Sequence, residues 1–433
     1  MKIEELYALY QDSSGVTTDT RAVQPGSLFF ALKGDKFDGN AFAAQAVEAG
    51  AAYAIVDDPS RAGDPRILMV PNVLQTLQEL ARYHRRQFAI AVIALTGSNG
   101  KTTNKELLIR VLGKKYKVHA TRGNLNNHIG VPLTLLAMPF DAQIAVIEMG
   151  ANHQQEIAEL CSIAEPTHGL ITNLGKAHLE GFGGEEGIRK GKGELFDYLK
   201  TTGGIVFANR SDAKVCALVA ERNILPVVFY GQDELSLRLI EESPVVQFQG
   251  PDHASVYRTH IGGRYNFDNM QTAHALGLYF DIPSQEACEA IASYNPDNNR
   301  SQTVHLGSNL FLMDAYNANP SSMEAALRSF GALQTDRPKV VILGDMYELG
   351  EYAEAEHAAL GALLKELNFD EVVLFGEQMQ AALPYLPKAY YFTDKFSMHN
   401  WVLDRAFENT YFLVKGSRST GLESVLKAME NAG

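Results

Sequence analysis

The feature that most constrains the fold of this chain is a repeated alternation of short apolar runs and helical segments. In the middle of the chain, apolar runs at Ala89–Leu95, Ile144–Ile147, Gly169–Ile171 and Gly204–Phe207 are typical of buried strands, and helical patterns lie between them. Strands that alternate with helices usually pair in parallel, because each helix returns the chain to the same edge of the sheet. The pattern therefore predicts an α/β fold with a parallel sheet covered on both faces.

The same alternation restarts near Arg300, which indicates a further α/β unit. The part before residue 85 has shorter strand-like runs and ends in an amphipathic helix over about residues 72–87. A length of 433 residues fits about three domains of ~150 residues each. We therefore expect a small α/β N-terminal domain (1–84), a central parallel-sheet domain (85–299) and a C-terminal Rossmann-like α/β domain (300–433). In the third domain we expect strands at 310–313, 340–343, 372–375 and 411–414, with helices at 323–330, 353–367 and 421–429.

The most specific motif, TGSNGKTT, connects a predicted buried strand to a predicted helix. Its residues are Thr96, Gly97, Ser98, Asn99, Gly100, Lys101, Thr102 and Thr103. The backbone N–H groups of such a turn point into one hollow, and the start of the helix adds positive potential there. Lys101 supplies a charge for the outer phosphates of a nucleotide, and Thr102 a hydroxyl for Mg²⁺. Thr96 replaces the first glycine of the strict GxxxxGK[ST] pattern, but the context favours phosphate binding and a central P-loop-type ATPase domain.

Three polar residues after the apolar runs are candidates for the same site. Glu148 and His178 each follow a predicted strand, at the sheet edge where α/β proteins bind ligands. From the residues alone, Glu148 is equally a Mg²⁺ ligand or a solvent-exposed strand end. A single histidine such as His178 is more often structural than functional. Lys192, in the basic run RKGK, is on sequence alone best interpreted as a solvent-exposed residue.

Composition excludes several other classes of protein. With 38 basic and 51 acidic side chains the formal charge is −13, which argues against a protein that coats nucleic acid. The three cysteines are far apart and form no CxxC pair, so we expect neither a disulfide framework nor a cysteine-based zinc site. The N-terminus lacks the apolar region of a signal peptide, and the longest apolar run is too short to cross a bilayer. These observations predict a soluble cytoplasmic protein.

Together with further motifs, these residues make the whole chain resemble the Mur ligase family. In order, the motifs are TDTR, PGSLFFALKG, DGNAF, TGSNGKTT, GNLNN, IEMGAN, TNLGKAHLEGFG, KGKGELF, GGRYNFDN, an isolated Arg300, DAYNANPSSMEAAL, LGDMYELG and KGSRST. Within the family, YNANPSSM, LGDMYELG and the short N-terminal domain resemble the members that act on UDP-N-acetylmuramoyl-tripeptide. The resemblance implies an N-terminal domain for the UDP-linked substrate, a central ATP-binding domain and a C-terminal ligase domain.

The resemblance also implies roles for individual residues. Lys101, His178 and Lys192 would be catalytic. The nucleotide would be bound by the segment Gly97–Thr103 together with Asn266, Asn269, Arg300 and Asp314. Two Mg²⁺ ions would be held by Thr102, Glu148, His178 and a carbamylated Lys192. The other substrates would contact Asp19, Thr20, Arg21, Asn126, Asn127, Lys415, Ser417 and Arg418.

The sequence departs from the family pattern at three places. Tyr265 stands where many relatives have histidine, and Met313 occupies a position that is often aspartate. The C-terminal KGSRST lacks the methionine that usually follows it. The methionine at position 313 leaves Asp314 as the only acidic candidate in its segment.

The activity that the resemblance implies is ATP-dependent amide formation in peptidoglycan precursor synthesis in the bacterial cytoplasm. The enzyme would join D-alanyl-D-alanine to UDP-N-acetylmuramoyl-tripeptide through an acyl phosphate and form ADP. We expect it to bind neither nucleic acid nor a membrane, and a monomer is the default expectation. We expect nucleotide to draw the last two domains together about a hinge near Asp297–Ser301. The alternatives are a Mur-type or folylpolyglutamate-type ligase with another amine acceptor, and a P-loop NTPase switch.

Overall fold

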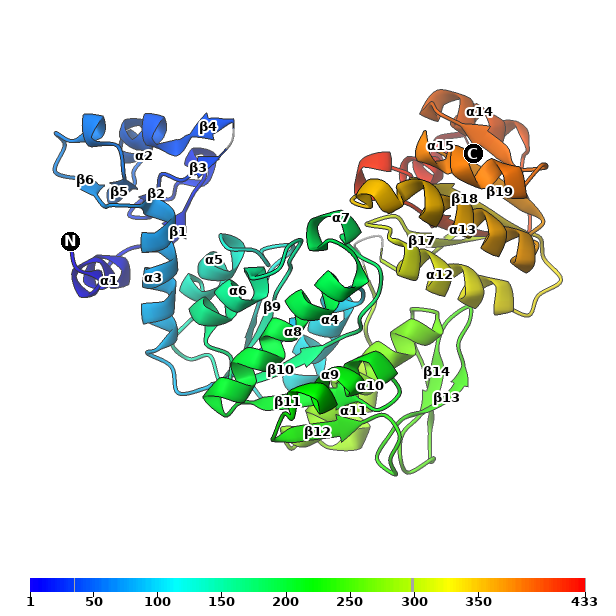
Figure 1. Cartoon of the computed structure of the whole chain (residues 1–433), viewed down its shortest axis with the longest axis horizontal. Coiled ribbons are helices and arrows are strands. Elements are labelled where there is room, and N and C mark those ends of the chain that lie inside the picture. Colours follow the sequence, from blue (N-terminus) through cyan, green and yellow to red (C-terminus); the bar gives the residue numbers. More distant parts are fainter. Residues whose placement is uncertain (35, 297–299, 433) are drawn as a thin grey trace.

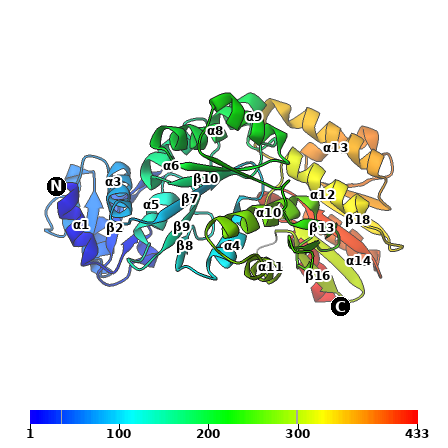
Figure 2. The ribbon, with the colours of Figure 1, turned by 90° about the horizontal axis from the view of Figure 1, so that it is seen from below.

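The computed structural model describes residues 1–34, 36–296 and 300–432, and it consists of three sheet-based units that follow one another along the molecule (Figure 1). The N-terminal unit lies at one end, the central unit in the middle and the C-terminal unit at the other end, also when the molecule is viewed from below (Figure 2). Of the predicted hinge, residues 297–299 lie outside the described residues. The described part contains no helix that is long and apolar enough to cross a membrane.

The N-terminal unit is built on a four-stranded parallel sheet in the order β1-β2-β5-β6. Its strands are β1 (Val16–Thr17), β2 (Leu28–Phe30), β5 (Tyr53–Val56) and β6 (Ile67–Met69), and a small hairpin is formed by β3 (Lys33–Gly34) and β4 (Phe37–Asp38). Its helices are α1 (Ile3–Gln11), α2 (Ala43–Glu48) and α3 (Val73–Arg85), with 3₁₀ turns η1 (Thr20–Ala22), η2 (Gly39–Phe42) and η3 (Pro59–Arg61). The side chain of Asn72 accepts a hydrogen bond from the Gln75 amide and so caps the start of α3. Beyond the sheet, α3 packs against helices α5 and α6 of the central unit.

The central unit contains a six-stranded parallel sheet in the order β12-β11-β10-β7-β9-β8. Its strands are β7 (Ala91–Thr96), β8 (Val118–Ala120), β9 (Ile144–Glu148), β10 (His168–Ile171), β11 (Ile205–Asn209) and β12 (Val227–Tyr230). The helices are α4 (Lys101–Leu112), α5 (Gly130–Leu136), α6 (Glu156–Ala164), α7 (Leu179–Phe182), α8 (Glu185–Thr202), α9 (Ala213–Arg222), α10 (Arg264–Tyr279) and α11 (Ser284–Ala292). A separate antiparallel sheet comprises β13 (Arg238–Glu241), β14 (Gln247–Gln249) and β15 (Val256–Arg258).

Strand β7 shows why the apolar runs fold as central strands. Val92 and Ala94 belong to the core on one face of the sheet, and Ile93 and Leu95 to the core on the other face. Because successive side chains of a strand point to opposite faces, a strand covered on both sides needs a continuous apolar run. The predicted parallel sheet with two covered faces is therefore confirmed.

The C-terminal unit contains a second six-stranded sheet in the order β16-β17-β21-β18-β19-β20. Strand β16 runs antiparallel to β17, and the other pairs are parallel. The strands are β16 (Gln302–Leu306), β17 (Asn309–Asp314), β18 (Lys339–Gly344), β19 (Glu371–Phe375), β20 (Tyr390–Phe392) and β21 (Tyr411–Lys415). The helical elements are α12 (Pro320–Ala332), η4 (Gly350–Tyr352), α13 (Ala353–Leu367), η5 (Gln378–Tyr385), α14 (Lys395–Asp404), η6 (Arg418–Thr420) and α15 (Ser424–Ala432). The expected α/β class with a Rossmann-like third unit is confirmed.

Candidate active site

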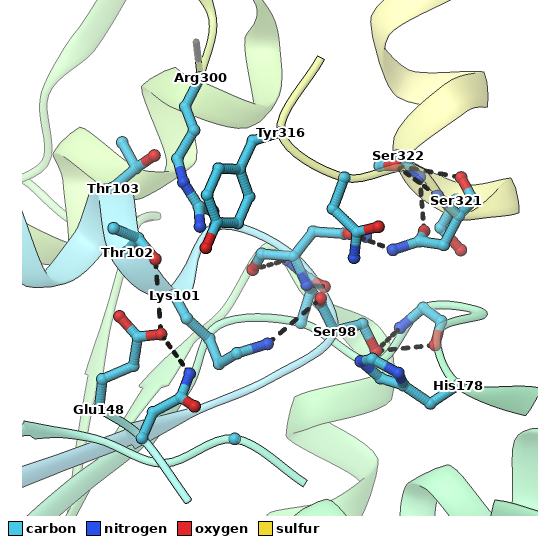
Figure 3. Close-up of a pocket in the computed structure, with 18 of the residues that line it drawn as sticks. Ser98, Lys101, Thr102, Thr103, Glu148, His178, Arg300, Tyr316, Ser321 and Ser322 are labelled. Carbon is cyan, nitrogen blue, oxygen red and sulfur yellow. Dashed lines mark hydrogen bonds between the residues drawn. The ribbon is translucent and has the colours of Figure 1, made fainter. Parts of the chain in front are cut away.

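A cavity of about 720 Å³ lies between the central and C-terminal units (Figure 3). The central unit contributes the loop after β7, the ends of β9 and β10, and the start of α10; the C-terminal unit contributes segments around residues 300–301 and 314–325. The following predicted site residues line it: Ser98, Asn99, Gly100, Lys101, Thr102, Thr103, Asn126, Asn127, Glu148, His178, Asn266, Asn269, Arg300, Asp314 and Lys415. The cavity is at the carboxyl edge of the parallel sheet, where ligands of α/β proteins bind.

The phosphate loop is held in shape by backbone geometry and by the end of β10. Gly100 has the left-handed φ of 78° at the start of α4, and Gly97 has a φ of 146°. A Cβ atom on Gly97 would lie 2.0 Å from the hydroxyl oxygen of Thr172, so only glycine fits there. Thr172 donates a hydrogen bond to the Asn99 carbonyl (2.6 Å), and the Asn173 side chain accepts one from the Asn99 amide (3.0 Å). The loop is thus fixed before any ligand enters.

Lys101 begins α4 and lies against the loop that precedes it. Its Nζ donates a hydrogen bond of 2.7 Å to the carbonyl oxygen of Gly97. Burial lowers the pKa of Lys101, an effect that the nearby Glu148 opposes and the Arg300 charge reinforces. Lys101 of the central unit and Arg300 of the C-terminal unit thus place two basic side chains in the lining of the cavity.

Glu148 ends β9 and is buried among three polar neighbours. Its Oε1 accepts hydrogen bonds from Asn126 (2.8 Å) and from the Thr102 hydroxyl (3.4 Å). Nζ of Lys105 lies 3.7 Å from Oε2, and both side chains are only 3% exposed. The interpretation of Glu148 as a solvent-exposed strand end is therefore wrong.

The surroundings of Glu148 fit a magnesium ion. Its Oε2 is buried and accepts no hydrogen bond from the described residues. The Thr102 hydroxyl contacts Oε1 of the same carboxylate, so the two side chains together offer hard oxygen donors, which Mg²⁺ prefers. Within residues 1–34, 36–296 and 300–432, no three His, Cys, Asp or Glu side chains surround one point as a metal site would need. Oxygens of a nucleotide or of water would have to complete the coordination.

His178 precedes α7 and faces the C-terminal unit. The residue has a left-handed φ of 57°, and its Nδ1 lies 2.5 Å from Oε2 of Glu348. This contact holds the pKa of the Glu348 carboxyl below its usual range. The interpretation of His178 as only a surface residue is not supported, because the side chain lines the cavity.

Lys192 is the clearest correction to the sequence interpretation. It is completely buried within α8, not solvent-exposed. Its Nζ donates a hydrogen bond of 3.0 Å to the Ala151 carbonyl and lies 4.9 Å from the centre of the Phe182 ring. Burial, reinforced by the charge of Lys101, lowers its pKa far below the usual lysine value. Burial therefore disfavours the charged form of the amine, although Lys192 does not itself line the cavity.

A chain of amides connects α10 to the phosphate loop. Asn104 donates a hydrogen bond of 2.6 Å to the side-chain oxygen of Asn269, and Asn269 donates one of 3.2 Å to Asn266. The Tyr265 hydroxyl is hydrogen bonded to the Ser301 hydroxyl at 3.0 Å. The start of α10 is thus in contact with both units.

The C-terminal unit supplies charges from neighbouring strand ends. Asp314 ends β17 and Lys415 ends β21, and the two residues are paired in register. Nζ of Lys415 lies 2.5 Å from Oδ2 of Asp314. Cζ of Arg300 lies 3.5 Å from the centre of the Tyr316 ring, a cation–π contact that orients the guanidinium (Figure 3).

Several predicted site residues lie outside the cavity. These are Gly97, Lys192, Asp19, Thr20, Arg21, Ser417 and Arg418. Asp19 and Arg21 are at the surface of the N-terminal unit, where hydrogen bonds from Arg21 lower the pKa of Asp19 to about 2. Ser417 accepts a hydrogen bond from the Tyr347 amide, and Arg418 pairs with Glu423 at 3.4 Å. The structure therefore does not bring the N-terminal motif into contact with the phosphate loop.

Sequence reasoning gave no role to several residues that shape the site. Lys105 belongs to the helix face one turn after Lys101, and nothing local indicates its pairing with Glu148. Asn319 donates a hydrogen bond of 2.7 Å to Asn99 across the two units, and Ser321 accepts one of 2.6 Å from the Lys176 amide. The asparagine-rich motif DAYNANPSS was a signal for both, since it precedes a predicted helix.

Comparison with known proteins agrees with this arrangement. Three family models match: "Mur ligase family, catalytic domain" over residues 12–87, "Mur ligase middle domain" over 95–277, and "Mur ligase, glutamate ligase domain" over 299–418. The chain is 36% identical to the UDP-N-acetylmuramoyl-tripeptide–D-alanyl-D-alanine ligase of Escherichia coli, over 96% of this chain and 94% of that protein.

Two solved structures are similar over nearly the whole length. A crystal structure of MurF from Acinetobacter baumannii is 33% identical, with a TM-score of 0.86 and 98% of each chain covered. The crystal structure of MurF ligase from Thermotoga maritima in complex with ADP is 26% identical, with a TM-score of 0.84 and 98% of each chain covered. From its motifs, its fold and these matches, the chain belongs to the Mur ligase family.

Proposed function

We propose that this protein is an ATP-dependent ligase that joins D-alanyl-D-alanine to UDP-N-acetylmuramoyl-tripeptide and releases ADP and phosphate. The observation that carries the proposal is the shared cavity, in which a phosphate loop with Lys101 faces Arg300, Asp314 and Lys415 of the next unit. Relatives with this printed name match more than nine tenths of both chains. We propose that the reaction takes place in the cytoplasm, where ATP is available, and that the protein acts as a monomer.

The main physical difficulty of this reaction is the repulsion between two anions. A substrate carboxylate must approach the γ-phosphate of ATP and attack it in line, so that an acyl phosphate forms and ADP leaves. Lys101 and Arg300 would reduce the repulsion, and the backbone amides of the loop would bind the phosphate oxygens. The amine of D-alanyl-D-alanine then attacks the acyl carbon, loses a proton and displaces phosphate.

Magnesium would complete this charge balance. When bound, Mg²⁺ neutralises phosphate charge and polarises the transferring group. Thr102 and Glu148 would hold one ion, because the Thr102 hydroxyl contacts one oxygen of the Glu148 carboxylate and the other oxygen accepts no hydrogen bond from the described residues. His178 and a carbamate on Lys192 would hold a second ion.

The complete burial of Lys192 supports the carbamate. A neutral amine has the lone pair needed to attack the carbon of CO₂, and loss of a proton then gives a carbamate anion. Burial lowers the pKa of Lys192 and so favours that nucleophilic form. An ammonium group would instead repel a metal ion, so the modification reverses the sign of the charge at this position.

The N-terminal unit would bind the uridine end of the substrate. Asp19, Thr20 and Arg21 match the family motif for that end, and Asn126 and Asn127 would contact the substrate nearer the cavity. Asn266 and Asn269 would contact adenine. With these roles, the proposed domain boundaries are 1–84, 85–299 and 300–433.

The decisive assay is ADP formation with UDP-N-acetylmuramoyl-tripeptide, with and without D-alanyl-D-alanine. We expect turnover to require both. Turnover with a different amine in place of the dipeptide would indicate another Mur-type or folylpolyglutamate-type ligase. ATP hydrolysis that is independent of any amine would favour a P-loop NTPase switch and would refute the proposal.

A further inference from the structure

Glu348, in the motif LGDMYELG, has no role in the function proposed so far. It lies between β18 and η4 of the C-terminal unit and has a left-handed φ of 63°. Its carbonyl oxygen accepts a hydrogen bond of 3.3 Å from the Glu180 amide of the central unit. Its Oε2 lies 2.5 Å from Nδ1 of His178, close to but not aligned as a hydrogen bond.

The two facing residues share an uncommon backbone geometry. His178, like Glu348, adopts the left-handed conformation, which residues other than glycine rarely take. Such conformations persist where the surroundings fix them, and they are frequent at functional sites. The backbone conformations of both loops therefore fix the close approach of the two side chains across the domain boundary.

The contact determines what the histidine ring can offer to the cavity. A carboxylate oxygen 2.5 Å from Nδ1 attracts a proton on that nitrogen, so we expect the tautomer that leaves the lone pair on Nε2. His178 lines the cavity together with Ser98 and Lys101 (Figure 3). A ring held in this tautomer presents an acceptor nitrogen to a metal ion or to a reacting proton.

Other contacts join the central and C-terminal units near His178 without touching the ring. Lys176 pairs with Glu356 at 2.6 Å, and its amide donates to the Ser321 hydroxyl at 2.6 Å. On the opposite side, Gly175 donates a hydrogen bond of 2.9 Å to the hydroxyl of Ser98 in the phosphate loop. Because these other contacts also hold the two units together, the contribution specific to Glu348 is its effect on His178.

We propose that Glu348 is a positioning residue, which fixes the orientation and tautomer of His178 from the opposite domain. His178 then reaches its working geometry only when the C-terminal unit is seated on the central unit, which ties the reaction to domain contact. The consequence for catalysis rests on the proposed ligase function, whereas the effect on the ring does not.

The kinetic test compares Glu348→Ala, Glu348→Gln and the matched control Glu356→Gln, which removes a carboxylate from the same interface but leaves the ring alone. We expect Glu348→Ala to lower kcat by about 10–100-fold, with the KM for ATP within about twofold of the original value. Glu348→Gln keeps an acceptor oxygen and is expected to restore most of kcat, and Glu356→Gln to change it by less than about threefold. Equal losses in Glu348→Ala and Glu356→Gln would overturn the proposal.

A double variant tests whether Glu348 acts through His178. In a His178→Ala background, adding Glu348→Ala is expected to lower the rate by less than about twofold, because the residue that it positions is already gone. Independent, multiplicative losses would contradict the inference.

A spectroscopic readout does not depend on the reaction. In protein labelled with ¹⁵N-histidine, the His178 ring signals, assigned with His178→Asn, are expected to show a proton on Nδ1 at fixed pH. Glu348→Ala is expected to shift them, and Glu356→Gln to leave them unchanged. Unchanged signals in Glu348→Ala would refute the positioning role even in an active enzyme, whereas a clear shift in a protein without ligase activity would refute only the proposed function.

Discussion

Removing the ammonium group of Lys105 tests the buried charge pair beside the phosphate loop. Its Nζ lies 3.7 Å from Oε2 of Glu148, and each side chain is 3% exposed. Breaking such a pair from one side costs about 3–5 kcal/mol, because the remaining charge stays buried without its partner. Asn126 still donates its 2.8 Å hydrogen bond to Glu148, so the lower end of that range applies. For Lys105→Met we therefore expect a loss of about 3 kcal/mol, or roughly 6–12 °C in Tm for a domain of this size.

The assay is thermal unfolding followed by calorimetry and by far-ultraviolet circular dichroism. The only tryptophan of the chain, Trp401, lies on α14, so its fluorescence reports separately on the C-terminal unit. The control is Lys105→Met combined with Glu148→Gln, which removes both charges and is expected to recover at least about 1 kcal/mol of the loss. Millimolar Mg²⁺ is expected to stabilise Lys105→Met more than the original protein, because Glu148 is then free to bind it. A Tm for Lys105→Met within about 2 °C of the original value would refute this reasoning.

Three further predictions concern the loop, its lysine and a buried histidine. Lys101→Ala is expected to lower the rate of ADP formation by at least about 10²-fold, since it removes a charge that acts on the phosphates; an unchanged rate would sink the proposed mechanism. Gly97→Ala is expected to abolish ADP binding in calorimetric titration, because its Cβ would lie 2.0 Å from the Thr172 oxygen, and unchanged affinity would show that the loop adapts. Burial lowers the pKa of His274 to about 4, so the unfolded chain takes up a proton first as the pH falls. The free energy of unfolding in urea is therefore expected to decrease as the pH falls from 6.5 towards 4. Other histidines whose pKa is lowered by burial, such as His168, act in the same direction, so His274→Gln is expected to lessen this decrease without abolishing it, and a pH dependence identical to that of the original protein would contradict the assignment.

The sequence predicts best those elements whose signal is local. Strand β7 is recognisable because a continuous apolar run is bounded by a glycine-rich turn, and α13 begins and ends at the predicted residues Ala353 and Leu367. The sheet of β13, β14 and β15 was not predicted, because its strands are short and partly polar. Strand β16 was also missed, because none of its side chains is fully buried and its sequence lacks the continuous apolar run that marks a central strand.

The site is less predictable where burial depends on distant contacts. Lys192 stands between two glycines, and this spacing allows other side chains to cover it: a Cβ on Gly191 would meet the Phe182 ring, and one on Gly193 would meet Arg222. The basic run itself indicates only charge, so the sequence alone suggested exposure. The pairing of Lys105 with Glu148 joins residues that are separated by a whole strand and helix. Such pairs become visible only when the sheet order is known.

The attachment of the N-terminal unit to the central unit has a consequence for substrate choice. Helix α3, with 13 residues, is about 20 Å long and packs along α5 and α6, so it acts as a rigid strut between the N-terminal sheet and the central unit. If the N-terminal unit binds the uridine end, this helix fixes the distance between the uridine site and the nucleotide site. That distance would then select substrates by their length. A substrate whose peptide is one residue shorter would then not reach the γ-phosphate with its carboxylate, even when its uridine end is fully bound.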